Sequence, residues 1–171
     1  MQNLALDHMT APAMRYDAFL ELARDLGCCG VEFRNDLAAP LFNGADPETV
    51  RWAAEAAGIR ILALAEVKSF NDWSDDKLEE ARALMTVAKA CGAEAVSLIP
   101  RNDGLGRANG ERQANLRLAL RELLPLLEEN GLTGLIEPLG FEVCALRYKS
   151  EAVEAIEALG AAGRYKLVHD T

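Results

Sequence analysis

Two short apolar runs in the second half of the sequence each end in a carboxylate. Glu137, followed by Pro138, comes directly after the run 133–136, and Asp170 follows the run 165–168. A proline ends the hydrogen-bond ladder of a strand, so the carboxylate before it is expected to be held in place. On neighbouring parallel strands both carboxylates would share a divalent cation, because hard cations accept such oxygen ligands. The pair predicts a metal site of Glu137 and Asp170, with helix capping or pairing to an arginine as the alternative.

Three further side chains are candidates for binding a substrate. His8, Lys68 and Arg147 come after apolar runs, and each could bind a hydroxyl or carbonyl oxygen. The alternatives are a buried structural role for His8 and solvated loop positions for the two cations. Glu32 and Glu66 are candidates for orienting such donors.

The elements that position these residues are indicated by six apolar runs that alternate with longer amphipathic segments. Such alternation is typical of strand–helix–strand units stacked around a parallel sheet. The runs are spaced 27 to 39 residues apart, near the length of one strand plus one helix. They lie at residues 4–6, 30–33, 59–64, 95–99, 133–136 and 165–168.

The alternation fits both an open doubly wound sheet and a barrel, but the residues after the runs distinguish the two. A barrel assembles its site at the C-terminal end of every strand, whereas an open sheet concentrates ligand groups at one switch point. All six runs finish in polar groups, namely Asp7-His8, Arg34-Asn35-Asp36, Glu66 with Lys68, Arg101-Asn102-Asp103, Glu137 and His169-Asp170. This favours an α/β fold of the TIM type, a (β/α) barrel.

The number of units predicts that the barrel is incomplete. Eight units need about 250 residues, whereas the sequence has 171 and stops just after the sixth run. We therefore expect a single partial barrel domain over residues 1–171, with the first six strands and five helices.

Residues typical of helix starts support the division of the chain into alternating strands and helices. Asp46, Asp76 and Ser150 are predicted N-caps, because their side chains can accept hydrogen bonds from the first turn. Residues 109–130 predict one long helix, and Pro125 is expected to kink or restart it.

The charge balance excludes one class of partner. Lys plus Arg number 18 and Asp plus Glu 27, which gives a net charge of −9 and a pI near 4.8. A surface this acidic repels phosphate backbones, so no nucleic-acid partner is expected. The first seven residues have neither a basic segment nor a long apolar stretch, which predicts a cytoplasmic protein without membrane association. The four cysteines include no CxxC pair and are expected to be reduced.

Four strings of the sequence resemble one protein family. They are Leu-Ile-Glu-Pro-Leu-Gly at 135–140, Leu-Val-His-Asp-Thr at 167–171, Gly-Val-Glu-Phe at 30–33 and Leu-Ala-Leu-Ala-Glu-Val at 62–67. Together and in this order, they resemble the xylose-isomerase-like barrel superfamily. Within it, the sequence is most similar to the inosose isomerases and related sugar isomerases or epimerases of inositol catabolism.

The resemblance implies a function for the complete barrel. It implies one divalent ion, Mn, Mg, Co or Zn, for which Glu137 matches the ligand on strand five and Asp170 the ligand on strand six. The family's other two ligands lie on strands seven and eight, which this sequence does not contain. The resemblance also implies a sugar or polyol ketone substrate and proton transfer through a cis-enediolate, with Glu137 as one acid/base.

The sequence is also compatible with other functions. A dehydratase acting on an inosose would share the enediolate, and an aldolase could form a Schiff base at Lys68 if desolvation lowered the pKa of its amine. A non-catalytic barrel fragment would self-associate through its exposed edges as a homo-oligomer. Apurinic-site endonucleases of the same superfamily use a histidine-rich zinc cluster and a basic groove, which two histidines and a charge of −9 do not supply.

Overall fold

A computed structural model describes residues 4–169 of the chain. Six strands alternate with five α-helices, and short 3-10 helices follow the first two strands. The strands are β1 (Ala5–Asp7), β2 (Gly30–Arg34), β3 (Arg60–Lys68), β4 (Ala95–Ile99), β5 (Thr133–Ile136) and β6 (Tyr165–Leu167). The helices are η1 (His8–Thr10), α1 (Tyr16–Asp25), η2 (Leu41–Gly44), α2 (Pro47–Ala57), α3 (Asp75–Cys91), α4 (Asn109–Asn130) and α5 (Lys149–Leu159).

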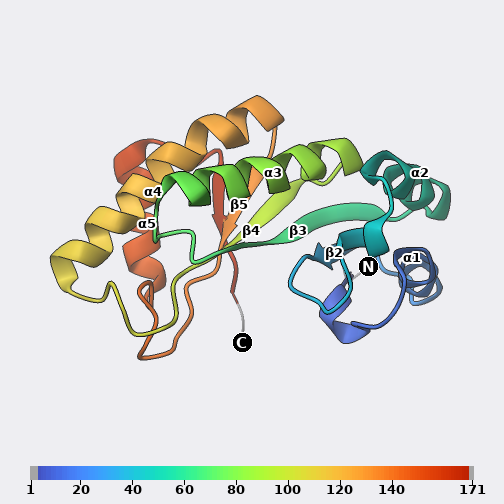
Figure 1. The fold of residues 1–171 in the computed structure, drawn as a ribbon, viewed down its shortest axis with the longest axis horizontal. Helices are drawn as coiled ribbons and strands as arrows, with labels where there is room; N and C mark the ends of the chain where they lie inside the picture. Colours follow the sequence, from blue (N-terminus) through green and yellow to red (C-terminus); the bar gives the residue numbers. More distant parts are fainter. Residues whose placement is uncertain (1–3, 170–171) are drawn as a thin grey trace.

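The strands form one parallel sheet in the same order as in the sequence, from β1 to β6. Each α-helix contacts the next one along the chain, and the helices lie along the outer side of the curved sheet (Figure 1). A doubly wound sheet would instead reverse its strand order at a switch point and carry helices on both faces. The predicted section of a (β/α) barrel, with six strands and five helices, is therefore confirmed, and within residues 4–169 β1 and β6 are its two edges.

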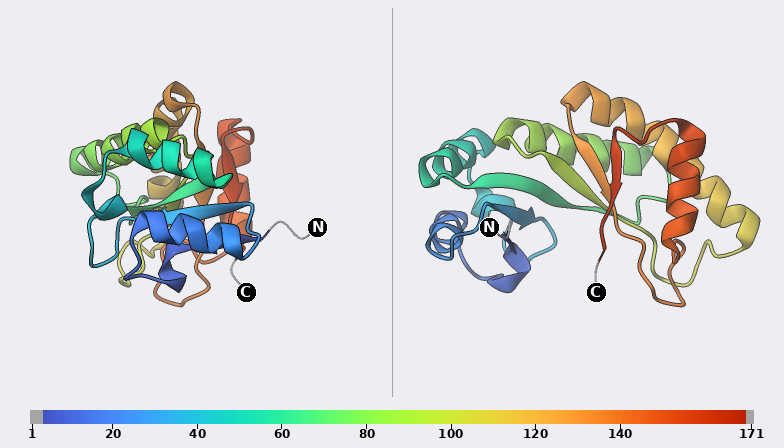
Figure 2. Two further views of the ribbon diagram at one scale, coloured as in Figure 1. Left: turned by 90° about the vertical axis from the view of Figure 1, so that its right-hand side faces the viewer. Right: turned by 180° about the vertical axis from the view of Figure 1, so that it is seen from behind.

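The two faces of the sheet differ in chemistry because alternate residues of a strand point to opposite sides. Val31, Phe33, Val96, Leu98 and Ile136 are fully buried and belong to the hydrophobic core beneath the helices. The residues that alternate with them are mostly polar or small, so these side chains belong to the other face of the sheet. The α-helices leave this face uncovered (Figure 2). We call this the open face, and it corresponds to the interior of a barrel.

Strand β3 is longer than its apolar run predicts. It continues beyond residue 64 to Lys68, so Glu66 lies within the strand and not after it. Pairing with β4 shifts register between Leu64 and Val67, which marks an irregular stretch around Glu66. The Asn35 side chain hydrogen-bonds the backbone polar groups of Glu66 in this stretch. Its Oδ1 accepts from the Glu66 N–H at 2.8 Å, and its Nδ2 donates to the Glu66 carbonyl at 3.1 Å.

The helix N-termini match the sequence prediction at one of three positions. Asp46 caps α2, since its side chain accepts hydrogen bonds from the second and third residues of that helix. The prediction for Asp76 is wrong, because Ser74 is extended and accepts the capping bond from Lys77 N at 3.2 Å. Ser150 is also wrong as a cap: α5 begins one residue earlier, after Tyr148, whose side chain makes no capping bond.

Helix α4 runs without a break through Pro125. The predicted range 109–130 is confirmed, whereas no restart of the helix occurs at the proline. Glycines stand at the C-terminal ends of α1 to α4 and take the left-handed conformation that favours this residue: Gly27, Gly58, Gly92 and Gly131.

The four cysteines match the expectation of reduced thiols. All four cysteines, Cys28, Cys29, Cys91 and Cys144, are free thiols, and burial raises the pKa of Cys91 to about 11. Within the described part of the chain, no helix combines the length and the apolar character needed to cross a bilayer.

Candidate active site

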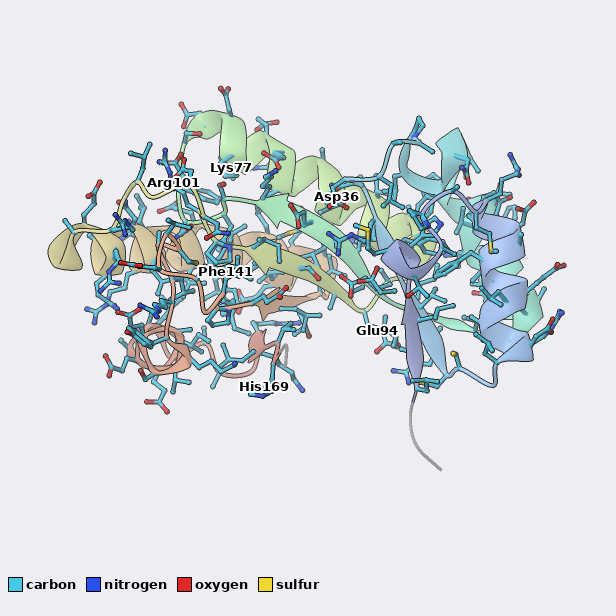
Figure 3. All side chains as sticks on the ribbon, turned by 90° about the horizontal axis from the view of Figure 1, so that it is seen from below. Asp36, Lys77, Glu94, Arg101, Phe141 and His169 are labelled. Carbon is cyan, nitrogen blue, oxygen red and sulfur yellow. The ribbon has the colours of Figure 1, made fainter. Side chains whose placement is uncertain are left out.

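A cavity of about 340 Å³ lies on the open face at the C-terminal ends of the strands. Five of its lining side chains can ionise, and each strand contributes at least one residue in or directly after it. The lining residues are Asp7, Glu32, Arg34, Ala65, Ser97, Ile99, Glu137, Val168 and His169. Figure 3 shows the molecule from below, with His169 labelled. The cavity is thus where a TIM-type barrel places its active site.

Arg34 is the centre of an ion-pair network at one wall of the cavity. Its Nε and Nη2 each donate to Asp36 at 2.8 Å, while Asp7 lies 3.5 Å away and Glu66 3.6 Å away. The hydrogen bond from Arg34 lowers the pKa of Asp36 and raises the pKa of Arg34. Because its fork is occupied by carboxylates, Arg34 neutralises charge within the chain and leaves the cavity predominantly acidic.

Glu32 and Ser97 form a second polar pair in the cavity. The Ser97 hydroxyl is buried and donates a hydrogen bond to Glu32 Oε1 at 2.8 Å. Burial raises the pKa of Glu32, and the hydrogen bond from Ser97 offsets part of this rise. The negative charges of Asp7 and Glu137 add to the rise, since both carboxylates line the same cavity as Glu32.

Glu66 is the most buried carboxylate of this region, with 9% of its surface exposed. Burial is the main cause of its raised pKa, and the charge of Asp36 raises it further. The charges of Arg34 and Lys68 oppose these effects. From this buried position, Glu66 pairs with Arg34 at 3.6 Å.

The structure places one predicted metal and catalytic residue, Glu137, in the cavity. Glu137 is half-buried and follows β5 directly, and its backbone N–H donates to the Leu98 carbonyl at 3.3 Å. This bond fixes the backbone at the point where the ladder ends before Pro138. Asp170, the second predicted ligand, lies outside the described residues, while its neighbour His169 lines the cavity.

The predicted substrate-binding residues are not among those that line this cavity. His8 is 5% exposed, its ring stacks on Phe19 at 4.4 Å, and its Nε2 lies 2.9 Å from the Met14 carbonyl. His8 therefore has the buried structural role that the sequence left as an alternative, because its ring packs against Phe19. Arg147 donates from Nε to the Gly140 carbonyl at 3.1 Å, which closes the loop after β5.

Lys68 borders a neighbouring hollow of about 420 Å³, together with Asn102 and Asp103. Its side chain is exposed.

Sequence reasoning did not identify Arg34 and Ser97 as site residues. Arg34 was visible as a polar residue at a strand end, but its role depends on three carboxylates from β1, β2 and β3. Ser97 lies inside an apolar run, and the only sequence signal for it is a polar residue at a position that alternates with buried aliphatic side chains. Such a residue points to the open face.

The cavity lining includes side chains of the kinds that bind metal ions, among them Glu137 and His169. Carboxylate and imidazole groups suit several divalent ions, and Glu137 offers one strand-end carboxylate. However, no group of three or more His, Cys, Asp or Glu side chains in the described segment has the geometry to hold an ion.

The pKa shift of Glu32 predicts how stability depends on pH. Since the carboxyl has a higher pKa in the folded chain than the value of about 4.3 in an unfolded chain, folding favours the protonated form, and stability falls as pH rises between the two values. Glu32→Gln keeps the acceptor for Ser97 but removes the charge. We expect it to raise the free energy of unfolding at pH 7, and the gain to shrink towards pH 4. Urea denaturation at both pH values, with exposed Glu154→Gln as the control, measures this, and a variant less stable than the parent at pH 7 would contradict it.

The family model described as "Xylose isomerase-like TIM barrel" matches residues 20–171. No match was found among curated proteins.

Several solved structures are similar to this one. A xylose isomerase domain containing protein from Salmonella typhimurium LT2 superposes with a TM-score of 0.89 at 28% identity, over 96% of this chain and 59% of its own. The IOLI protein, with a bound zinc atom, has a TM-score of 0.85 at 19% identity, over 97% and 62%. D-psicose 3-epimerase in the presence of D-fructose has a TM-score of 0.74 at 14% identity, over 95% and 61%. The present chain thus spans about three fifths of the length of these proteins.

Proposed function

Because the chain belongs to the xylose isomerase-like TIM barrel family, we propose that its cavity is part of the active site of a divalent-metal-dependent isomerase or epimerase. The substrate would be a sugar or a polyol ketone. The observation that carries the proposal is the position of Glu137, a half-buried carboxylate fixed at a strand end and lining an acidic cavity. Isomerases and epimerases of this kind move a proton at a carbon next to a carbonyl group, and a fixed carboxylate is a suitable base.

In this proposal Glu137 takes a proton from the substrate carbon and returns it. Its neighbours Asp7 and Glu32 add to the negative charge of the cavity lining. A divalent cation bound by Glu137 and Asp170 would stabilise negative charge that develops on the substrate oxygens. Since the chain covers about 59% of the Salmonella protein and 62% of the IOLI protein, the activity is proposed for the protein with a complete barrel.

The experiment that tests this function compares the chain with an extended version. The extension is the part of the Salmonella protein that follows the matched region. We expect Mn²⁺ binding by calorimetry to be tight only in the extended protein, and mass spectrometry to show deuterium from D₂O entering a ketose such as D-fructose or an inosose. An extended protein that folds and binds Mn²⁺ but incorporates no deuterium into either ketone would disprove the proposal.

We also propose that the chain self-associates through its sheet edges. Both β1 and β6 are three-residue edge strands in the described part of the chain, and Leu4 and Met9 near β1 are about half exposed. Unpaired edges and exposed apolar side chains favour association. Light scattering is expected to give a mass above 18.6 kDa at high concentration, with Leu4→Lys shifting the chain towards monomer. A chain that stays monomeric at every concentration would contradict this.

A further inference from the structure

The hydrogen bond between Glu32 and Ser97 spans three strands of the open face. Glu32 is on β2 and Ser97 on β4, with β3 between them. β3 places Ala63 opposite Glu32 and Ala65 opposite Arg34. Methyl groups leave room above β3, so the two polar side chains can meet at 2.8 Å. A larger inward residue on β3 would separate them.

This contact occupies only one oxygen of the Glu32 carboxyl. Ser97 donates to Oε1, and Glu32 forms no ion pair with any described residue. Arg34, two residues further along the same strand, is engaged by Asp36, Asp7 and Glu66. Glu32 therefore lines the cavity with a carboxyl whose orientation is fixed and whose second oxygen has no described partner.

The composition of the cavity restricts the kind of ligand that this carboxyl can bind. Asp7, Glu32 and Glu137 repel phosphate and carboxylate groups, and the charge of Arg34 is already offset by three carboxylates within 3.6 Å. A hydroxyl group is compatible with Glu32 in both protonation states, because it can donate to a carboxylate and accept from a carboxylic acid.

We propose that Glu32, positioned by Ser97, binds a hydroxyl group of the substrate and selects an uncharged polyhydroxylated ketone over its phosphorylated counterpart. This rests on the proposed function, since it assumes that the cavity accepts such a ketone. Glu32 touches the substrate in this arrangement, whereas Ser97 acts by holding the carboxyl in one orientation.

The test is titration of the isotope-labelled chain with D-fructose, followed by NMR at the backbone amides of Ala65 and Ser97. We expect saturable shifts, and Glu32→Ala should weaken binding about tenfold, as for the loss of a hydrogen bond to a charged group. Glu32→Gln should keep D-fructose affinity within about threefold, because the amide still donates and accepts. Ser97→Ala should weaken binding less than Glu32→Ala, and the exposed Glu154→Ala should leave it unchanged.

A second readout separates recognition from a merely structural role. D-fructose 6-phosphate should bind more weakly than D-fructose, and Glu32→Gln should narrow this difference because it removes one repelling charge. Circular dichroism verifies that each variant is folded. Absence of saturable binding to the parent chain, or equal D-fructose affinity in folded Glu32→Ala, would overturn the assignment.

The outcome for Glu32 is distinguishable from the outcome for the proposed function. If the extended protein exchanges deuterium while Glu32→Ala binds D-fructose as the parent chain does, only the hydroxyl assignment fails. If Glu32→Ala weakens D-fructose binding but the extended protein exchanges no deuterium, only the isomerase function fails.

Discussion

Replacing Phe33 with alanine is expected to lower the free energy of unfolding by about 3–5 kcal/mol, the usual cost of removing a buried aromatic ring. Phe33 is completely buried. Its ring contacts Phe42 at 5.1 Å, Phe19 at 5.6 Å and His8 at 5.4 Å between centroids, all edge to face. These contacts join β2 to η1, α1 and η2. The cavity left by alanine would therefore loosen the support behind Glu32 and Arg34.

Urea denaturation of the two proteins measures this loss. The matched control is Phe141→Ala, because Phe141 is 60% exposed and its removal should change stability by no more than about 0.5 kcal/mol. If Phe33→Ala does not fold, Phe33→Leu keeps most of the buried volume and should show a smaller loss of the same sign. A loss below about 1 kcal/mol for folded Phe33→Ala would show that this aromatic cluster is not tightly packed.

The second large effect is expected at Glu137. In the extended protein, Glu137→Gln should lower the rate of deuterium incorporation into the ketone by about 10²- to 10⁴-fold, the usual contribution of a positioned acid or base. Glutamine has the same size but cannot take a proton from carbon. The backbone bond from residue 137 to the Leu98 carbonyl does not depend on the side chain, so the strand end should keep its position.

Mass spectrometry after a fixed time in D₂O gives both rates. Glu142→Gln is the matched control, because Glu142 is an exposed glutamate in the same loop, and its rate should stay within about twofold of the parent. A Glu137→Gln protein that exchanges at the parent rate would remove Glu137 from the proton transfer, even if metal binding changed.

The fold could be predicted from the sequence because the residues that face the helices are apolar at regular positions. Val31, Phe33, Val96 and Leu98 produce runs that mark β2 and β4 directly. The end of β3 could not be predicted in this way. Its last residues include Glu66, whose backbone carbonyl accepts a hydrogen bond from the side chain of Asn35, a residue 31 positions earlier.

Helix starts were harder to predict than helix ends. Several acceptors compete at the start: Ser74, Asp75 and Asp76 can all cap α3, and the extended backbone of Ser74 decides between them. At the ends, a glycine with positive φ is the main choice, so Gly58 and Gly92 indicate the correct positions.

The candidate site could be predicted only in part. Glu137 is visible because a carboxylate at a strand end, followed by proline, is a local pattern. The Glu32–Ser97 pair joins residues 65 positions apart, and it depends on the register of β2, β3 and β4, which no local pattern contains. His8 shows the opposite difficulty, since a polar residue after a strand was expected to face the cavity but packs against Phe19.

The two alanines of β3 that lie opposite Glu32 and Arg34, Ala63 and Ala65, have a consequence for protein engineering. Ala65 lines the cavity opposite Arg34 on the neighbouring strand, and its side chain is a single methyl group. Substitution by glycine, serine or valine would change the depth of the cavity in steps while Arg34 and Glu137 stay in place. Residue 65 is therefore the natural first position for a library that redesigns which sizes of molecule the protein accepts.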